Sequence, residues 1–282
     1  MSFASKSSDF RTYDQVRQHY EIEKELANRL RSASKEQRRH LYTDLYNELF
    51  IRVPHHPQHA RKASPVETAT VVGFQKRFIE RFLTADSMFM EIGPGDCSVS
   101  KEISKLAKKV YAVDVSSEIT KNPELPSNFN LIISDGTSID VEGGSIDVVY
   151  SNQLMEHLHP DDAIDQLKNI YKALCRGGVY ICITPNRLTG PHDVSKYFQD
   201  EVATGFHLKE YTTSEMKKMF MEVGFSEFRV YIPIKGNFFR VPLFVVALNE
   251  KMLELLPYKI RRLVLKIKLF RFILGSGFVG IK

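Results

Sequence analysis

The stretch Met90-Glu91-Ile92-Gly93-Pro94-Gly95-Asp96-Cys97 decides the fold class of this 282-residue chain. An apolar run over 87–92 leads into its Gly-Pro-Gly turn, and a helical pattern over 98–107 follows. Glycines let the backbone pass close to a ligand, and the N-terminus of a helix offers N–H groups without a partner inside the helix. This order predicts a strand, a ligand-binding turn and a helix.

The turn departs from the G-x-G-x-x-G pattern of dinucleotide-binding folds. Ser98 stands where that pattern has its third glycine, and Glu91 lies two residues before Gly93. A carboxylate there would be unfavourable near a pyrophosphate, which such folds hold at the helix N-terminus, but it suits a cationic ligand. The turn therefore argues against a dinucleotide.

Strands and helices alternate on the C-terminal side of the turn. The apolar runs predict further strands at 110–113, 130–134, 146–150, 179–184 and 225–232. Helical patterns lie between them at 160–174 and 212–223. This alternation predicts an α/β fold with a parallel, doubly wound sheet.

The two flanks of this region lack the alternation. Roughly the first 85 residues predict helices without a strand, and Ser34 and Gln37 form a capping box at the start of one of them. At the other end, 241–256 and 258–274 predict two helices, and 277–282 predicts one last strand. The two C-terminal helices would then be an insertion before a closing edge strand.

Polar residues stand where the predicted strands end. Asp114 ends the second strand, 21 residues after Gly93, where a carboxylate can accept hydrogen bonds from ribose hydroxyls. Asp135 follows the third strand and could accept from an adenine amino group, and Ser151 and Asn152 lead to the same edge. Ligands of open α/β sheets bind outside the carboxyl ends of the strands, so a ligand site is expected there. Asp114 could instead only cap a helix, and Asp135 could be only a turn residue.

These features together resemble the class I S-adenosylmethionine-dependent methyltransferases, in the broad small-molecule group that includes quinone-biosynthesis enzymes. The resemblance covers about residues 86–232. Its motifs are the first turn, in which Cys97 replaces the usual third glycine, Gln153-Leu154-Met155-Glu156-His157-Leu158 after the fourth strand, and Leu174-Cys175-Arg176-Gly177-Gly178 before the fifth.

The resemblance implies S-adenosylmethionine as cofactor and S-adenosylhomocysteine as product. Asp114 matches the acidic ribose ligand, Asp135 matches the adenine ligand, and the glycine turn would pass beneath the methionine part. The expected cofactor-binding residues are Glu91, Gly93, Pro94, Gly95, Asp114, Val115, Asp135, Gly136, Ser151 and Asn152.

The resemblance also implies a Rossmann-like, seven-stranded sheet of order 3-2-1-4-5-7-6, in which strand seven is antiparallel. Residues 277–282 are the candidate for that strand. The expected organisation is an N-terminal helical lid or substrate region over 1–85 and a methyltransferase domain over 86–282. A basic helical insertion at 240–274 would belong to the second unit.

Three histidines are candidate catalytic bases. Proximity and orientation carry most of the acceleration in methyl transfer from a sulfonium, and a base is needed only when the acceptor must lose its proton early. His157 follows the fourth strand, His192 has a carboxylate neighbour in Asp193, and His207 lies in a stretch that resembles a family pattern. Each also has a structural alternative, such as fixing its loop to the sheet.

No metal is expected. Pro57 separates His55 and His56 from His59 and prevents a regular helical pair, and the sequence places no acidic or cysteine ligand beside them. A solvated or substrate-facing loop is the preferred interpretation.

Composition narrows the class and location of the chain. Apolar residues make up 43% and charged residues 26%, which is typical of a folded globular protein. Three cysteines are too few for a disulfide framework. The chain has no apolar run of about 18 residues, and its first residues lack the apolar core of a signal peptide, so a cytoplasmic location is expected.

The basic excess lies in the C-terminal segment. Residues 255–282 carry seven basic groups and no acidic group. A helix that interleaves cations with apolar residues could make peripheral contact with a membrane through 257–274, or it could cover the sheet with its cations solvated. Covering the sheet is the preferred interpretation. No nucleic-acid partner is expected, because the chain shows no basic face with reading elements.

The sequence therefore predicts S-adenosylmethionine-dependent methyl transfer to a small-molecule or lipid-linked acceptor, with O-methylation as the first expectation. Three alternatives stay open. One is an oxidoreductase that binds an NAD-type dinucleotide, and another is a protein that binds S-adenosylmethionine without catalysis. The third is a nucleic-acid methyltransferase, which is disfavoured because Ser151-Asn152-Gln153-Leu154 stands where an Asn-Pro-Pro-aromatic or Asp-Pro-Pro-aromatic motif would follow the fourth strand.

Overall fold

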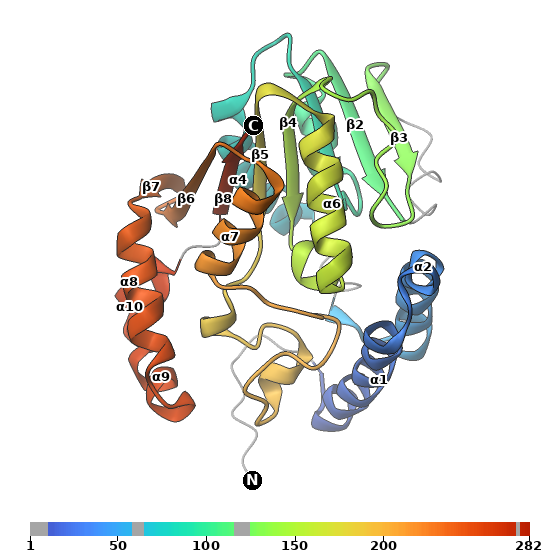
Figure 1. Ribbon diagram of the computed structural model, residues 1–282. Coiled ribbons are helices and arrows are strands. Elements are labelled where there is room, and N and C mark those ends of the chain that lie inside the picture. The colour runs from blue at the N-terminus through green and yellow to red at the C-terminus, as the bar shows by residue number, and fades with distance from the viewer. Residues whose placement is uncertain (1–10, 58–64, 116–124, 275–276) are drawn as a thin grey trace.

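Eight strands form a single sheet in the order β3-β2-β1-β4-β5-β8-β6-β7 in the computed structural model, which describes residues 11–57, 65–115, 125–274 and 277–282 (Figure 1). The strands are β1 (Met88–Ile92), β2 (Lys109–Asp114), β3 (Phe129–Ile133), β4 (Ile146–Asn152), β5 (Leu174–Ile183), β6 (Glu227–Ile234), β7 (Asn237–Val241) and β8 (Gly277–Ile281). The first five are parallel to one another, whereas β8 runs antiparallel between β5 and β6. The expected order 3-2-1-4-5-7-6 is confirmed, with 277–281 as the antiparallel strand. The expectation that this strand closes an edge is wrong, because β8 pairs with a strand on each side.

The strand β7 is an addition to the expected seven-stranded sheet. Lys235 and Gly236 both have positive φ, 48° and 80°, and Ile234 pairs directly with Asn237. A two-residue turn with two positive φ angles matches the right-handed twist of a hairpin, so the chain reverses and adds an edge strand beyond β6. The expected insertion at 240–274 therefore starts within a strand.

Helices cover both faces of the sheet (Figure 1). The helices α6 (Pro160–Ala173) and α7 (Thr213–Val223) lie on one face, and α4 (Pro65–Ile79) and α5 (Ser98–Ile103) on the other. Each pair buries an apolar face against strand residues in its own hydrophobic cluster. This arrangement leaves the carboxyl ends of the parallel strands uncovered by the layer helices.

The first two helices lie beyond those carboxyl ends (Figure 1). They are α1 (Tyr13–Ser32) and α2 (Lys35–Arg52), and the predicted capping box of Ser34 and Gln37 opens α2. The buried guanidinium of Arg38 holds α2 against α6, because it donates to both carboxylate oxygens of Asp162 at 2.6 and 2.8 Å. Within 1–85, α1 and α2 thus stand at the strand ends, whereas α4 belongs to a layer of the sheet.

The C-terminal helices form a separate addition beside β6 and β7 (Figure 1). They are α8 (Leu243–Glu254), α9 (Tyr258–Val264) and α10 (Lys268–Ile273), where the sequence predicts one helix over 258–274. The chain turns between α9 and α10, which lets Leu265 and Leu274 both join the cluster of Leu188 and Leu253. No helix in the described ranges combines the length and the apolar character that crossing a bilayer requires.

Candidate active site

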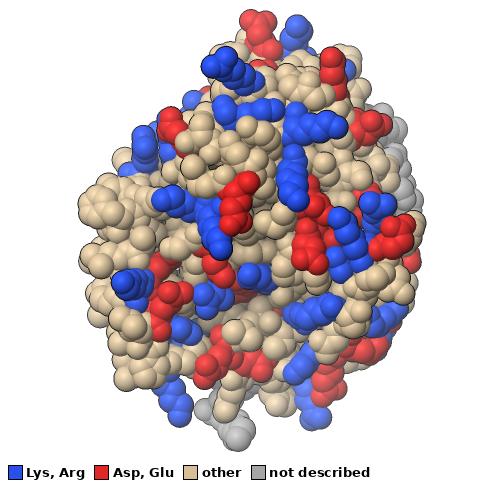
Figure 2. Space-filling view, in the orientation of Figure 1, with Lys and Arg blue, Asp and Glu red and all other residues tan. Residues whose placement is uncertain are grey.

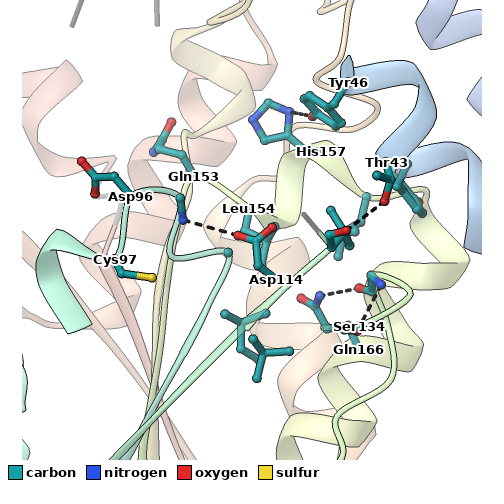
Figure 3. Close-up of a pocket in the computed structure, with 18 of the residues that line it drawn as sticks. Thr43, Tyr46, Asp96, Cys97, Asp114, Ser134, Gln153, Leu154, His157 and Gln166 are labelled. Carbon is teal, nitrogen blue, oxygen red and sulfur yellow. Dashed lines mark hydrogen bonds between the residues drawn. The ribbon is translucent and has the colours of Figure 1, made fainter. Parts of the chain in front are cut away.

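A cavity of about 600 Å³ lies at the carboxyl ends of β1, β2 and β4. The glycine turn forms its floor, residues after β2, β3 and β4 form its sides, and α2 forms the opposite wall (Figure 3). Five of the expected cofactor residues line it: Gly93, Gly95, Asp114, Val115 and Gly136. This size and position suit a small-molecule site.

The glycine turn brings main chain and carboxylate together. Gly93 and Gly95 have φ of +70° and +58°, a conformation that other residues rarely adopt, and a Cβ on Gly95 would meet no atom within 4 Å. The Gly95 N–H points to the Asp114 carboxylate at 3.4 Å (Figure 3). The turn therefore presents a bare backbone and an anionic acceptor on the same side of the cavity.

A second acceptor comes from α6. The Gln166 side chain donates to the Gly136 carbonyl at 2.8 Å, and its Oε1 is buried without a hydrogen-bond partner in the described part of the chain. Gln166 also lines the cavity. A buried acceptor without a partner is costly, so this oxygen is poised for a donor on a ligand.

Asp135 does not line the cavity, contrary to the sequence expectation. Its Oδ1 accepts from the backbone N–H groups of Thr137 and Ser138 at 3.0 and 2.8 Å, and both hydroxyls donate to its carboxylate. Although burial opposes the charge, these hydrogen bonds hold the pKa of Asp135 below its usual value. The carboxylate is used by its own turn, and Gln166 occupies the position facing the cavity.

Four more expected cofactor residues, Glu91, Pro94, Ser151 and Asn152, are also absent from the cavity lining. The Glu91 carboxyl is buried and accepts a hydrogen bond from the Ser100 hydroxyl of α5, and burial raises its pKa to about 7. The Ser151 hydroxyl pairs with the Tyr180 hydroxyl at 2.7 Å inside the sheet. Side chains alternate between the faces of a strand, so a residue at the right edge can still point away from the ligand.

His157 is the candidate base that lines the cavity. Its Nδ1 lies 2.8 Å from the Tyr46 hydroxyl and 3.0 Å from the Phe206 carbonyl oxygen (Figure 3). A carbonyl only accepts, which assigns the proton to Nδ1 and leaves Nε2 as an acceptor. Burial, together with the nearby His207, lowers the pKa of His157 to about 3, so the ring is neutral.

His207 and His192, the other two candidate bases, do not line the cavity. His207 Nδ1 is 2.7 Å and His192 Nδ1 is 3.1 Å from opposite oxygens of Glu210. Burial opposes the charges, but the two histidines lower the pKa of Glu210 to about 2, and Glu210 in turn raises that of His207. The edge of the His207 ring meets the His157 ring at 4.8 Å. The structure thus places His207 as a neighbour of His157, and His192 one step further away.

Glu156 adds a second buried carboxyl to this group. It accepts from the Thr184 hydroxyl at 2.9 Å through Oε2, and its Oε1 has no hydrogen-bond partner among the described residues. Burial raises its pKa to about 7. A carboxyl with this pKa changes its protonation near neutral pH, beside the histidine pair.

The histidines near Pro57 meet an acidic residue that the sequence does not place there. His19 Nε2 lies 2.6 Å from Glu23, and the His56 ring packs edge-on against His19. Arg11 donates to His19 Nδ1, so the Nε2 that faces Glu23 carries the proton. The geometry is that of an imidazole N–H that faces a buried carboxylate. His59 lies outside the described residues.

Sequence reasoning missed the wall formed by α2. Its lining residues are Tyr42, Thr43, Tyr46, Asn47 and Phe50. They recur at the spacing of one helical face, which was a readable signal, but the same spacing also describes a helix face that packs in a core. Thr43 ties this wall to the strand edge by donating to the Val115 carbonyl at 3.0 Å (Figure 3).

Comparison with known proteins identifies part of the chain. Residues 90–182 match the family model described as "Methyltransferase domain". Phosphoethanolamine N-methyltransferase 1 of Triticum aestivum is 32% identical over 101 residues, which cover 33% of this chain and 20% of that protein. The chain thus spans about a fifth of the length of this curated relative.

Solved structures share the fold. An S-adenosylmethionine-dependent methyltransferase from Archaeoglobus fulgidus is 16% identical with a TM-score of 0.50, and the match covers 75% of this chain and 93% of that one. A candidate O-methyltransferase from Nostoc punctiforme is also 16% identical, with a TM-score of 0.51 and coverage of 82% and 61%. At this identity the likeness concerns the fold.

Proposed function

We propose that this chain, which carries a class I S-adenosylmethionine-dependent methyltransferase domain, transfers the methyl group of S-adenosylmethionine to a small-molecule or lipid-linked acceptor. A hydroxyl oxygen is the first candidate for the accepting atom. One observation carries the proposal. The cavity extends from the cofactor residues around Asp114 to the Tyr46–His157 pair of α2 and the loop after β4. Such a cavity has room for an acceptor next to the cofactor.

The residues present fit the cofactor. The Asp114 carboxylate suits a ribose diol, and the partnerless Gln166 Oε1 suits an adenine amino group. The apolar side chains of Val115, Leu125 and Ile139 line the same region and can hold a flat base. When bound, S-adenosylmethionine supplies an electrophilic methyl group on a sulfonium with a good leaving group.

His157 and Tyr46 are proposed to position the acceptor. Burial keeps both side chains neutral, because it lowers the pKa of His157 to about 3 and raises that of Tyr46 well above its usual value. A base with so low a pKa takes up a proton poorly at neutral pH, but its Nε2 can accept a hydrogen bond from an acceptor hydroxyl. Orientation of the lone pair toward the methyl group is the expected contribution.

An amine is the second candidate acceptor. The wheat relative is named a phosphoethanolamine N-methyltransferase, and it matches 33% of this chain. An amine that enters the cavity neutral presents its lone pair without a base, which a neutral His157 also permits. Oxygen and nitrogen acceptors therefore need a direct comparison.

The cofactor part is tested by calorimetric titration with S-adenosylmethionine, S-adenosylhomocysteine and NAD. We expect micromolar binding of both adenosyl compounds and none of NAD. Asp114→Ala should weaken S-adenosylhomocysteine binding about tenfold to hundredfold, since charge-assisted hydrogen bonds contribute about 1.5–3 kcal/mol. Asp96→Ala is the matched control, because Asp96 also lines the cavity but accepts from the N–H of Ser98. Equal losses in both variants would contradict the ribose assignment.

The acceptor part is tested with a panel of phenols, amines and lipid-linked hydroxyl compounds, monitored by release of S-adenosylhomocysteine. Tyr46→Phe should lower kcat/KM about fivefold for the best acceptor, since one hydrogen bond contributes about 1 kcal/mol, and leave cofactor affinity unchanged. Tyr13→Phe in α1 serves as the control. Cofactor binding without turnover on any acceptor would favour a non-catalytic binding protein.

A further inference from the structure

The outer face of α8 carries an apolar stripe that is exposed to solvent in the described chain. Phe244, Leu248 and Leu255 are 74%, 69% and 78% exposed, and Met252 lies on the same stripe. We infer that this stripe, continued over α9 and α10, is a surface that binds an anionic lipid bilayer. The inference goes beyond the proposed reaction and does not depend on it.

The stripe is not an incomplete core. The opposite face of α8 is already buried through Val246, Asn249, Glu250 and Leu253. The Glu250 carboxylate accepts hydrogen bonds from Asn186 and from the N-terminus of α7, and Asn249 donates to the Phe270 carbonyl of α10. The addition is therefore fixed to the protein by its inner face, and its outer face is left for another partner.

The two short helices extend the same surface. Neither α9 nor α10 has a buried residue. Large exposed apolar side chains recur along them and in the turn between them: Ile260, Leu263, Ile267, Leu269 and Phe272. Ten of the large exposed apolar residues in the described chain lie between 239 and 272, so the apolar exposure is concentrated in this addition. Concentrated exposure of this kind marks an interaction surface.

The basic side chains of this surface indicate an anionic partner. Exposed cations are interleaved with the apolar residues, and none forms an ion pair within the described chain: Lys251, Lys259, Arg262, Lys266, Lys268 and Arg271. The nearest exposed acid, Glu254, is neutralised by Arg187 at 3.0 Å. Figure 2 shows uncharged side chains along the left edge of the molecule, over the place of α8 and α9 in Figure 1, with a few basic and acidic side chains beside them.

A bilayer with anionic headgroups can bind both the apolar and the basic side chains of this surface. Apolar side chains can enter the boundary between headgroups and acyl chains, while long cationic side chains reach the phosphates. No described helix is long and apolar enough to span a membrane, so the proposed contact would be peripheral. The surface would also bring a lipid-linked acceptor to the protein.

The test is sedimentation of the full chain with vesicles of phosphatidylcholine alone or with about 30% phosphatidylglycerol. We expect binding to the anionic vesicles, at least tenfold stronger than to the neutral ones. Leu248→Ser/Leu263→Ser/Leu269→Ser should abolish it, whereas Ile51→Ser/Val66→Ser/Val202→Ser, which changes three exposed apolar residues elsewhere, should not. Melting temperature and S-adenosylhomocysteine affinity check that both variants are folded.

A charge variant separates the two contributions. Lys259→Gln/Arg262→Gln/Lys266→Gln/Lys268→Gln should remove the preference for anionic vesicles. Absence of wild-type binding to anionic vesicles, or equal binding by the outer-face variant, would overturn the inference. So would self-association that the same apolar substitutions abolish while vesicle binding is absent, because the surface would then serve a second copy of the chain.

Discussion

The helical additions at the two ends of the chain use their apolar residues in opposite ways. In the N-terminal addition, α2 directs Tyr46 and Phe50 into the cavity and buries Leu45 and Leu49. In the C-terminal addition, α8 buries one stripe and leaves a second stripe with Phe244 exposed. Both additions carry many cations, but most of those of α1 and α2 pair with acids, whereas those of α9 and α10 form no ion pair within the described part of the chain.

The role of each helical addition therefore depends on what lies against the helix face that is not packed on the rest of the protein. For α2 the second face meets a cavity at the strand ends, so its residues become part of the candidate active site. For α8 the second face meets solvent, so its residues are available to something outside the molecule. Three measurements test whether the two additions differ in this way.

The largest effect is expected where the N-terminal addition is anchored. Arg38→Ala should lower the free energy of unfolding by about 3–5 kcal/mol, because it leaves the Asp162 carboxylate buried without its cation. Arg39→Ala, one residue further, should cost at most about 1 kcal/mol, because Arg39 is 44% exposed and its acidic partners lie 3.6–3.7 Å away. Urea unfolding of both variants measures the difference, and equal losses would show that α2 is not held through Arg38.

The second effect separates the two faces of α8. Leu253→Ala should lower the free energy of unfolding by about 2–5 kcal/mol, because Leu253 is fully buried against Leu188, Leu265 and Leu274. Leu248→Ala on the outer face should change it by less than about 0.5 kcal/mol. A large loss for Leu248→Ala in the isolated protein would show that the outer stripe packs within the molecule.

The third and smallest effect concerns the sheet that both additions share. Burial raises the pKa of Glu91 from 4.5 to about 7, so the folded state keeps a proton that the unfolded state has released. The stability that this proton contributes is full below pH 4.5 and is lost as the pH rises through about 7. Glu91→Gln should remove this loss, on the order of 2–3 kcal/mol between pH 5 and 8.

Denaturant unfolding of wild type and Glu91→Gln at both pH values checks the sign. Glu156, whose pKa is also about 7, remains in both proteins and cancels in the difference. The same variant tests the expectation that Glu91 binds the cofactor. Unchanged S-adenosylhomocysteine affinity supports the geometry, in which Glu91 faces Ser100, whereas a tenfold loss would return Glu91 to the cofactor site.

The sheet was predictable because its signals are local. The glycine turn and the alternating runs predict the strands, and the family resemblance that they carry implies the strand order, with 277–282 as the antiparallel strand. The hairpin at 235–236 was missed because its turn residue Lys235 adopts a positive φ that its residue type does not predict. The break at 265–267 depends on a cluster assembled from three distant segments.

The candidate site was only partly predictable. Asp114 and the glycines were found because a strand end and a turn fix their position. Asp135 was misplaced because backbone N–H groups two and three residues away compete for its carboxylate. Gln166 and the individual lining residues of α2 were missed because the spacing of a helix face does not distinguish a face that lines a cavity from one that packs in a core.

The position of β8 has a consequence for synthesis of the chain. β8 pairs with β5 and β6, yet residues 184–276, which include β6, β7 and the C-terminal addition, leave the ribosome before it. Until residues 277–281 emerge, the nascent chain holds β5 and β6 with open edges that can pair with other chains. β6 and β7 therefore cannot join the strands that carry the cavity until residues 277–281 are available, and a ribosome that stalls between 242 and 276 would keep the two parts of the sheet apart.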